Sequence, residues 1–529
     1  MLFKRSRTYQ VGMELLKGKK KEREQEDSGI TFDLHCLGAG EYLGGAKILE
    51  KYSMGQATVT IAERPNGKGV YLIDEPPMTE NDRMLYAQIM KQMFLSIKPV
   101  VDAPEEKIHA RVKQQILSVS NSIGLGDNVK HILDKLMYYI VRDMVNYGIV
   151  GVLMQDPDIE DIMAENFNIN VGIIHRRYSE YGILDTNILF KDANRMNAFV
   201  QKLVQRCSKT ITAAVPYVDA ITDEGHRISA TFGKEISLPG PNFTIRKFSS
   251  DPFTMTNLIK FNTLNLLIAA YIWLLIDAKA FFLVIGPTAA GKTTTIGAVI
   301  SMMHPGVKVT TIEDTPELRI PHEHWQRLIT RKGYSIFESK YDIDMNSLVK
   351  LALRSRPDYI VVGEVRGEEA SSLIQAVATG HGGITSFHAS DPRSALVRLG
   401  SPPLNVQLAG QMLIWCFIRQ NKVTMNGKMV RRIMDITEVV PKDSSIELKK
   451  VFEWNPIDDT YTPNTIDDLM EKSQRLKEVM MLRGYTEEAL KQDLRRRQEF
   501  LEQLIVTKKE KFIDVTNEFS RFYLKSYKQ

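Results

Sequence analysis

The sequence predicts an α/β protein with two folded parts, the larger of which is built on a parallel sheet covered by helices on both faces. A chain of 529 residues is too long for a single hydrophobic core. From about Asn257 onward, helical runs alternate with short apolar runs that are typical of buried strands. Between Pro157 and Ser249, short strand-like runs surround one helix expected at residues 192–207, which indicates a smaller α/β domain.

Four segments are expected from these changes in pattern. They are an N-terminal extension as a candidate partner-binding region (1–95), an N-terminal α/β domain (96–248), a linker (249–256) and a larger α/β domain with a helical C-terminal tail (257–529). The linker is placed at Ser249-Ser250-Asp251-Pro252, because these residue types favour turns and loops.

The N-terminal elements follow from alternation and helical spacing. Two strands are expected at 57–62 and 70–73, separated by a glycine-containing turn. Residues 104–150 have a helical pattern, and their buried face is expected to carry Ile132, Leu133, Leu136, Met137 and Ile140. Three further strands are expected at 168–174, 227–230 and 242–246.

The larger domain opens with two apolar runs, Leu266–Ile276 and Ala280–Ile285. Neither approaches the ~20 residues that cross a bilayer, so we expect a buried helix followed by a core strand. Further strands are expected at 307–312, 359–362 and 384–387. Asn426-Gly427 between two strand-like runs predicts a hairpin.

Beyond Asp467 the tail is charged and helical. We expect a helix packed on the domain surface through Leu490, Leu494, Leu501 and Ile505.

The amino-acid composition argues against several classes of function. Charged residues make up 25% of the chain, hydrophobic residues make up 43%, and the net charge is only +5, so nothing indicates nucleic acid as a partner. Cys36, Cys207 and Cys416 lie far apart, which supports neither a disulfide framework nor a zinc site. A reducing cytoplasm fits this cysteine pattern.

Residues Gly286 to Thr293 read G-P-T-A-A-G-K-T, between an expected strand and an expected helix, which is the context of a nucleotide phosphate-binding loop. Backbone N–H groups of Gly291 and Lys292 would cradle phosphate oxygens. The Lys292 side chain would reach the β- and γ-phosphates of ATP, and the Thr293 hydroxyl would hold Mg²⁺. The predicted nucleotide-binding residues are Gly286, Pro287, Thr288, Ala289, Ala290, Gly291, Lys292, Thr293 and Thr294.

Acidic and histidine residues follow the next strands. The segment Glu313-Asp314-Thr315-Pro316-Glu317 ends one strand, and Glu364 ends another. Carboxylates at these strand ends face the ligand crevice of a parallel sheet and can hold magnesium or activate water. His381 and His388 flank the strand at 384–387, and both are candidates for sensing the γ-phosphate.

Four segments together resemble the type II/type IV secretion ATPase superfamily, where they form the Walker A, Asp, Walker B and His boxes. They read G-P-T-A-A-G-K-T-T, T-I-E-D-T-P-E-L, R-S-R-P-D-Y-I-V-V-G-E-V-R-G and T-G-H-G-G-I-T-S-F-H-A. Upstream, L-M-Q-D-P-D-I-E-D-I, I-I-H-R-R-Y and G-P-N-F-T-I-R-K-F resemble the archaeal branch, which includes archaellum motor ATPases and type IV pilus assembly ATPases.

The resemblance implies a RecA-like ATPase domain, a PAS-like N-terminal domain and a magnesium-dependent ATP hydrolase. By motif position, Glu317 is the catalytic glutamate, Glu364 holds magnesium or its water, and His388 contacts the γ-phosphate. Arg246 and Arg227 match positions that reach the nucleotide, and Arg354 and Arg356 are the next candidates. Which arginine acts across a subunit boundary stays open.

The resemblance also implies a cytoplasmic homohexamer, peripheral to the membrane, that acts on a polytopic platform protein to assemble or rotate a surface filament. Archaellum and pilus both remain open. The alternatives are a RecA-like nucleic-acid translocase, a DNA-transfer-type secretion ATPase or a nucleotide-binding regulator that hydrolyses ATP poorly. The chain lacks the four-cysteine zinc module of bacterial pilus-extension relatives, which favours the archaeal branch. Ala289-Ala290 replaces the Ala-Ser or Gly-Ser common in relatives, and no loss of activity is expected because the loop binds phosphate through its backbone.

Overall fold

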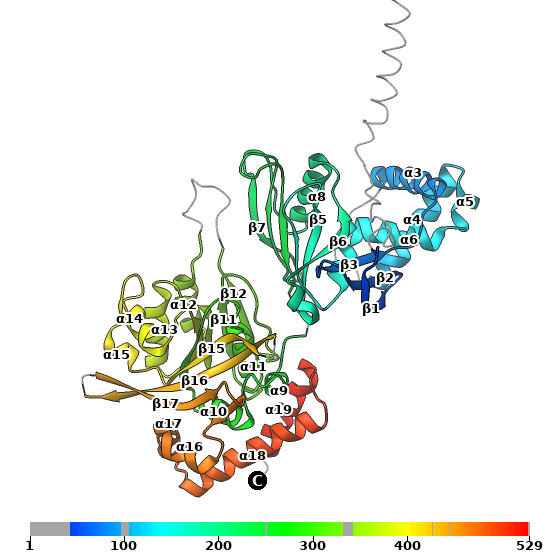
Figure 1. Cartoon of the computed structure of the whole chain (residues 1–529). Coiled ribbons are helices and arrows are strands. Elements are labelled where there is room, and N and C mark those ends of the chain that lie inside the picture. Colours follow the sequence, from blue (N-terminus) through cyan, green and yellow to red (C-terminus); the bar gives the residue numbers. More distant parts are fainter. Residues whose placement is uncertain are drawn as a thin grey trace, which may run out of the picture. The chain divides into compact units, whose positions relative to one another are not determined.

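The chain forms two compact units, one up to Phe248 and one from Ser249 onward (Figure 1). The computed structural model describes residues 43–96, 105–248, 251–331, 342–425, 427–443 and 445–526. Each unit contains its own sheet and its own hydrophobic core.

In its described part, the first unit has one nine-stranded sheet with the order β1-β2-β3-β6-β5-β4-β9-β8-β7. Its strands are β1 (Lys47–Met54), β2 (Ala57–Glu63), β3 (Gly69–Asp74), β4 (Ile159–Ala164), β5 (Asn170–His175), β6 (Ile183–Leu189), β7 (Tyr217–Ile221), β8 (Arg227–Thr231) and β9 (Phe243–Arg246). Its helices are α3 (Glu80–Ser96), α4 (Glu105–Ser122), α5 (Gly126–Lys130), α6 (Leu133–Ile140), η1 (Val141–Val145), η2 (Gly148–Val150), α7 (Gly151–Gln155), η3 (Arg176–Tyr181) and α8 (Ala193–Gln205).

Strands from two of the predicted segments share this sheet. β3, in the range assigned to an N-terminal extension, pairs in parallel with β6 through Val70↔Asp185 and Tyr71↔Thr186. Alternate residues of β2 and β3 enter the same core as α8 and the strands of the 96–248 range, so residues 47–74 are part of this unit's packing. The role of residues 1–95 as a partner-binding region and the PAS-like character of the domain stay predictions.

The expected strand pair, the helical region and the three further strands of this unit are confirmed. Asp192 caps α8 by accepting a hydrogen bond from the backbone N–H of Arg195 at 2.8 Å, which fixes where this helix begins. In α6, Leu136 and Ile140 are buried as expected. Ile132, Leu133 and Met137 are partly buried against the same cluster, which also receives α3 and α4.

The second unit also has, in its described part, one nine-stranded sheet, with the order β12-β11-β13-β14-β10-β15-β16-β17-β18. Its strands are β10 (Phe281–Ile285), β11 (Val309–Glu313), β12 (Trp325–Ile329), β13 (Tyr359–Glu364), β14 (Gly382–Phe387), β15 (Cys416–Met425), β16 (Lys428–Lys442), β17 (Ser445–Asn455) and β18 (Thr460–Thr462). Its helices are α9 (Met255–Lys260), α10 (Leu266–Asp277), α11 (Lys292–Ile300), α12 (Met345–Arg354), α13 (Glu369–Ala378), α14 (Pro392–Gly400), α15 (Leu408–Gln411), α16 (Ile466–Lys472), α17 (Gln474–Arg483), α18 (Glu487–Val506) and α19 (Phe512–Ser526).

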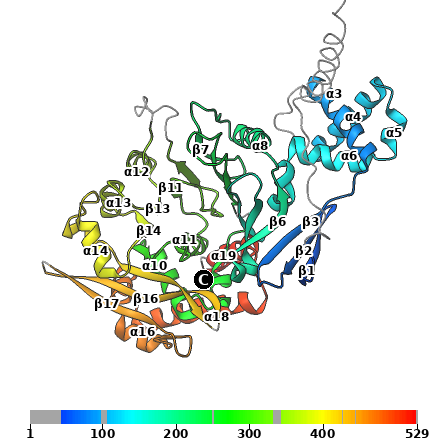
Figure 2. The same ribbon diagram turned by 45° about the horizontal axis from the view of Figure 1, so that its top comes forward.

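The strands from β12 to β15 are parallel, and helices cover both faces of this part of the sheet (Figure 2). Side chains of β10 alternate between the two faces, as successive residues of a strand must. Phe282 and Val284 enter the core with α10 and α11, while Leu283 and Ile285 enter the core with α12 and α13. The predicted parallel sheet with helices on both faces is therefore confirmed.

The antiparallel part of the sheet begins at β15. This strand pairs with β16 up to Met425↔Lys428, so the two strands form the predicted hairpin, although Asn426 lies outside the described residues. Since β15 also pairs in parallel with β10, the hairpin is attached directly beside the strand that leads into the phosphate-binding loop.

The apolar run at the start of the second unit is a buried helix, as predicted. Residues Leu267–Ile276 of α10 are buried. Trp273 packs edge-on against Phe519 of α19, with ring centroids 4.8 Å apart. Among the described residues, no helix combines the length and the apolar character that crossing a bilayer requires.

The C-terminal tail packs on this helix through α18 and α19. The expected apolar face of α18 is confirmed at Leu490, Leu494 and Leu501, but Leu504 is buried in place of Ile505. The buried Arg497 forms an ion pair with Asp277 of α10 at 2.8 Å. The tail is thus an integral part of the second unit's core.

Candidate active site

The phosphate-binding loop leaves β10, which lies between β14 and β15. Gly286, at φ 153°, runs so close to β15 that a Cβ there would collide with the backbone carbonyl of Gln420. Ala289 and Gly291 also have positive φ, at 62° and 94°. The loop is therefore sharply curved, and its shape depends on the neighbouring strand as well as on its own glycines.

Helix α11 begins directly after the loop. Its N-cap is Gly291, and no side chain caps the helix by a hydrogen bond. The N–H groups of its first turn therefore remain available to a phosphate, where the helix dipole also favours negative charge. Thr293 and Thr294 lie half-buried in this turn, while the buried Thr295 donates a hydrogen bond to the side-chain oxygen of Gln420 at 2.8 Å.

Lys292 folds back over the loop. Its ammonium donates to the carbonyl oxygens of Gly286 at 3.0 Å and Pro287 at 2.9 Å, and the residue is only 8% exposed. Burial lowers the pKa of Lys292, and the charges of Glu364 and Glu317 oppose this effect. The lysine is thus held inside the loop, near both predicted catalytic glutamates.

His388, Glu364 and Lys292 form one continuous polar row. The Nζ atom of Lys292 lies 3.4 Å from Nδ1 of His388, and Nε2 of His388 lies 3.2 Å from Oε1 of Glu364. Burial and the charge of Lys292 lower the pKa of His388, which leaves a neutral ring at pH 7. This arrangement fits the tautomer that donates from Nε2 to Glu364 and accepts at Nδ1 from Lys292.

Arg366 completes the row. It donates to Oε2 of Glu364 at 2.6 Å. Burial opposes the ionisation of Glu364, but the hydrogen bond and charge of Arg366, with the charges of His388 and Lys292, outweigh it and lower the pKa of this carboxyl. Glu364 is therefore an anion at neutral pH.

The acidic turn after β11 contains two carboxyl groups in opposite environments. Glu313 is 2% exposed, and its Oε1 accepts the backbone N–H groups of Glu317 and Leu318, both at 2.8 Å. Burial raises the pKa of Glu313 to about 7, although these two hydrogen bonds oppose the rise. Glu317 itself is exposed. Glu313 is thus placed to shape the turn that presents Glu317.

These residues fit ATP and a divalent cation. The loop offers backbone N–H groups and Lys292 for phosphate oxygens. Thr293 and Glu364 offer the hard oxygen ligands that Mg²⁺ prefers.

The predicted arginines belong to two different units. Arg227 and Arg246 are directly opposed on β8 and β9 of the first unit, so their side chains share one face of that sheet. Each forms an ion pair there, Arg227 with Asp219 at 2.6 Å and Arg246 with Asp161 at 3.2 Å. Arg354 and Arg356 are exposed in the second unit, just before β13. Nucleotide contacts of all four remain predictions.

The structure contradicts the prediction that His381 senses the γ-phosphate together with His388. His381 precedes β14, whereas His388 follows this strand, so the two histidines lie at opposite ends of β14. A strand of this length spans about 20 Å. His381 instead makes a 2.9 Å hydrogen-bond contact between its Nδ1 and the carbonyl of Ala376 in α13.

Sequence reasoning missed three residues around the site, which contact the loop, helix α11 or His388. Arg431 on β16 donates to the carbonyl of Ala289 at 3.2 Å, and Gln420 contacts the loop from β15. Arg398 on α14 donates to the carbonyl of His388 at 2.6 Å. No local pattern marks Gln420 or Arg431, because both reach the loop through the long-range pairing of β10 with β15.

Comparison with known sequences gives the family. The sequence model of the type II/IV secretion system proteins matches residues 155–512, which covers more than half of the chain. This chain belongs to the type II/IV secretion system protein family. Within the matched range lie the loop, the acidic turn, Glu364 and His388.

Relatives come from archaea and bacteria. An uncharacterised protein of Methanocaldococcus jannaschii is 32% identical over 420 residues, which cover 75% of each chain. The conjugal transfer protein TrbB of Rhizobium radiobacter is 34% identical over 224 residues, which cover 40% of this chain and 65% of that protein.

Among solved structures, the pilus retraction motor PilT with bound ADP matches with 19% identity and a TM-score of 0.37, over 61% of this chain and 85% of that one. The ATPase DotB of Yersinia pseudotuberculosis matches with 15% identity and a TM-score of 0.40, over 72% of this chain and 92% of that one.

Proposed function

We propose that this chain is a magnesium-dependent ATPase that powers a secretion-type machine, and that the machine assembles an archaeal surface filament, either an archaellum or a type IV pilus. The observation that carries the proposal is the row Lys292–His388–Glu364 beside the phosphate-binding loop. It joins a phosphate-binding cation, a neutral histidine and an ionised carboxylate at the carboxyl ends of adjacent parallel strands.

In this proposal, different residues of the chain have separate roles in ATP hydrolysis. The loop N–H groups and Lys292 bind the β- and γ-phosphates, and His388 contacts the γ-phosphate. Thr293 and Glu364 would hold Mg²⁺, which supplies charge neutralisation on the phosphates when bound. Glu317 orients the attacking water and accepts its proton. Arg246 and Arg227 would add positive charge as the γ-phosphate leaves.

The machine context rests on membership of the family. We propose that the chain works as a homohexamer in the cytoplasm, peripheral to the inner face of the cell membrane. Hydrolysis would alternately open and close the first unit relative to the second, and this movement would act on a polytopic membrane platform protein.

Purified protein tests the enzymatic part. Phosphate release from ATP is measured with Mg²⁺ and with EDTA, for the wild type and for Lys292→Ala. We expect metal-dependent turnover that Lys292→Ala abolishes. Equal release by both proteins, or none by the folded wild type, would overturn the proposal.

A chromosomal Glu364→Gln variant in the source organism tests the filament part, by electron microscopy and swimming assays. Loss of swimming and of its filament, with adhesive fibres intact, indicates an archaellum motor. Loss of adhesive fibres with normal swimming indicates a pilus assembly ATPase. If neither filament changes, the filament assignment is wrong.

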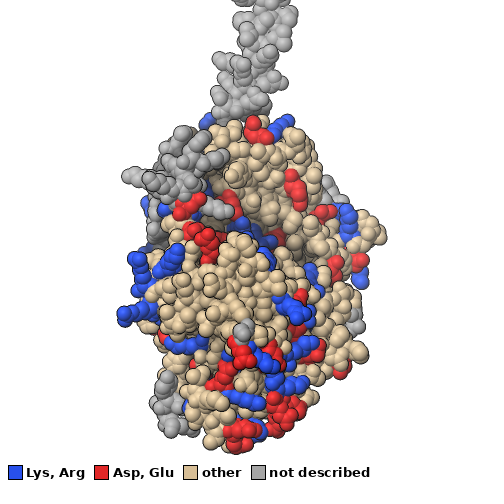
Figure 3. Space-filling model, turned by 90° about the vertical axis from the view of Figure 1, so that its left-hand side faces the viewer, with Lys and Arg blue, Asp and Glu red and all other residues tan. Residues whose placement is uncertain are grey.

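A DNA-transfer-type secretion ATPase is the second candidate, because a TrbB conjugal transfer protein is among the relatives. The small net charge favours the filament machine. Basic and acidic side chains are interspersed on the face drawn in Figure 3, and the net charge is only +5. Turnover that single-stranded DNA stimulates several-fold would reverse this preference.

A further inference from the structure

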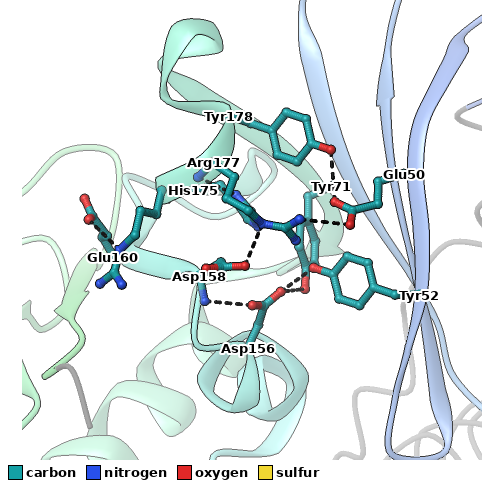
Figure 4. Close-up of polar contacts among 10 residues, drawn as sticks. Glu50, Tyr52, Tyr71, Asp156, Asp158, Glu160, His175, Arg177 and Tyr178 are labelled. Carbon is teal, nitrogen blue, oxygen red and sulfur yellow. Dashed lines mark hydrogen bonds and ion pairs between the residues drawn. The ribbon is translucent and has the colours of Figure 1, made fainter. Parts of the chain in front are cut away.

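A second polar cluster lies in the first unit, far from the loop in sequence. Asp156 and Asp158 immediately precede β4, and His175 is the last residue of β5. The two strands are antiparallel, with Ile159 paired to His175, so the histidine is adjacent to the acidic pair. Figure 4 shows these side chains with their tyrosine and arginine neighbours.

The three residues have the geometry of a metal-binding set. One ligand atom from each of Asp156, Asp158 and His175 lies within 4.8 Å of the other two. Asp156 is 1% exposed and His175 is 0% exposed, whereas the Asp158 side chain is 29% exposed. The set is therefore enclosed on one side and reachable from solvent through Asp158.

The carboxylate of Asp156 is buried among neutral donors. Its Oδ2 accepts the hydroxyl groups of Tyr52 and Tyr71, and its Oδ1 accepts the backbone N–H of Asp158 at 2.9 Å. Lys247 binds the backbone carbonyl of Asp156, and its charge also interacts with the Asp156 carboxylate without a direct hydrogen bond to it. A buried carboxylate normally pairs with a cation or coordinates a metal.

His175 provides an independent observation. Its Nδ1 accepts the backbone N–H of Arg177 at a long 3.3 Å. Its Nε2 is buried and has no hydrogen-bond partner among the residues that the structure describes. One ring nitrogen of this histidine lies within 4.8 Å of both carboxylates, and a buried Nε2 without a partner is an unexplained polar group.

We propose that Asp156, Asp158 and His175 bind a divalent transition-metal ion. One imidazole nitrogen with two carboxylates is a donor set that suits zinc or manganese, and water can complete the coordination through the exposed side at Asp158. Binding through Nε2 places the ring proton on Nδ1 and replaces the long contact with Arg177.

Arg177 binds one carboxylate of the proposed site but occupies only one of its two oxygens. Its Nε donates to Oδ2 of Asp158 at 2.7 Å, which leaves Oδ1 of this carboxylate for the ion. The same guanidinium donates to Glu50 of β1 at 2.9 Å, so it serves as an outer partner that orients Asp158.

The ion would join the N-terminal strands to the rest of the unit. Tyr52 of β1 and Tyr71 of β3 both hold Asp156, while His175 belongs to β5. Binding to the folded state alone raises its stability, so added metal should raise the melting temperature of this unit.

Full-length protein stripped with EDTA and free of nucleotide tests the proposal. It is titrated with Zn²⁺ by calorimetry and with Mn²⁺ by electron paramagnetic resonance. We expect one ion per chain at this site, a nitrogen coupling to bound Mn²⁺ and a higher melting temperature. Thr293→Ala, which removes the proposed magnesium ligand at the loop, should keep this ion, so the result is independent of the proposed ATPase site.

The matched variants are Asp158→Asn and Glu160→Gln. Asp158→Asn weakens a ligand while keeping an acceptor for Arg177, and at least about a tenfold loss of affinity is expected. Glu160, on β4 and 3.2 Å from Arg176, lies outside the set, so Glu160→Gln should bind as the wild type does. Wild-type protein that binds neither ion, or Asp158→Asn with unchanged affinity, overturns the proposal. His175→Gln, checked for folding by circular dichroism, should lose the nitrogen coupling.

Discussion

At the scale of single residues, two glutamates that are four positions apart in the chain differ in their burial. Glu313 is enclosed and accepts two backbone N–H groups, whereas Glu317 is exposed near Lys292. The exposed carboxylate is suited to meet water and the buried one to hold the turn. Their substitutions should therefore have different consequences.

Glu317→Gln should keep ATP binding and lose turnover. A glutamine keeps the size and hydrogen bonding of the side chain but cannot accept a proton, and general bases typically contribute 10²–10⁴-fold to rate. Equilibrium binding of a fluorescent ATP analogue and phosphate release measure the two properties. Normal hydrolysis by this variant would move the role of base to Glu313.

Glu313 should make stability depend on pH. Burial raises its pKa from the usual 4.5 of a glutamate to about 7, so the folded state favours the protonated carboxyl. Its stabilising contribution is complete below about pH 4.5 and is lost as pH rises through 7. Relative to Glu313→Gln, which cannot ionise, the wild type should become progressively less stable between pH 5 and pH 8.

The melting temperatures of the wild type and of Glu313→Gln, measured between pH 5 and pH 8, test the direction of this pH dependence. The nearby charges are Arg327, which lowers the pKa of Glu313, and Glu317, which raises it. A constant difference between the two proteins would mean that Glu313 stays ionised throughout.

At the scale of elements, the phosphate-binding loop is shaped by a strand far away in sequence. Gln420 of β15 blocks any side chain at Gly286 and also holds Thr295 of α11. Arg431 of the adjoining β16 touches the loop at Ala289. The β15–β16 hairpin therefore acts as a support for the nucleotide site.

Gly286→Ala should abolish ATP binding, because its methyl group would displace β15 from the loop. Gly297→Ala is the matched control. It lies in α11, and the nearest atom to its added methyl group would be Cδ2 of Leu318 at 3.9 Å. This control should bind ATP normally and gain up to about 1 kcal/mol of helix stability. ATP binding by the two variants is measured by calorimetry. Full ATP binding by Gly286→Ala would contradict the role given to Gln420.

Sequence alone located the elements that carry local signals. The loop, the acidic turn, Glu364 and His388 were found because each follows an apolar strand within a few residues. Two features needed the structure because they depend on pairing between distant segments. Gln420 and Arg431 reach the loop through β15, and β3 joins β6 across the helical region. Of the two candidate histidines, only His388 follows β14 and lies at its carboxyl end, where ligands bind in a parallel sheet, whereas His381 precedes this strand.

At the scale of the whole molecule, the proposed chemistry draws on both units. Lys292, His388 and Glu364 belong to the second unit, and the paired arginines Arg227 and Arg246 belong to the first. If one subunit of a hexamer lends these arginines to another, activity depends on assembly.

Mixing experiments test this dependence. The double variant Arg227→Gln/Arg246→Gln should bind ATP but lose at least about 10³-fold in turnover. Mixed with Lys292→Ala, which keeps its arginines, it should regain part of the activity, since mixed hexamers then contain complete sites. Arg195→Gln, an arginine on α8 of the same unit, is the control and should be fully active. Unchanged turnover in the double variant would exclude both arginines.

The position of β10 also has a consequence for how the protein is made. This strand is synthesised before both of its neighbours, since β14 begins at Gly382 and β15 begins at Cys416. A ribosome-bound chain that ends before Gln420 lacks the strand against which Gly286 is fitted. The phosphate-binding loop therefore cannot take its final shape until β15 has been synthesised, late in the translation of the second unit.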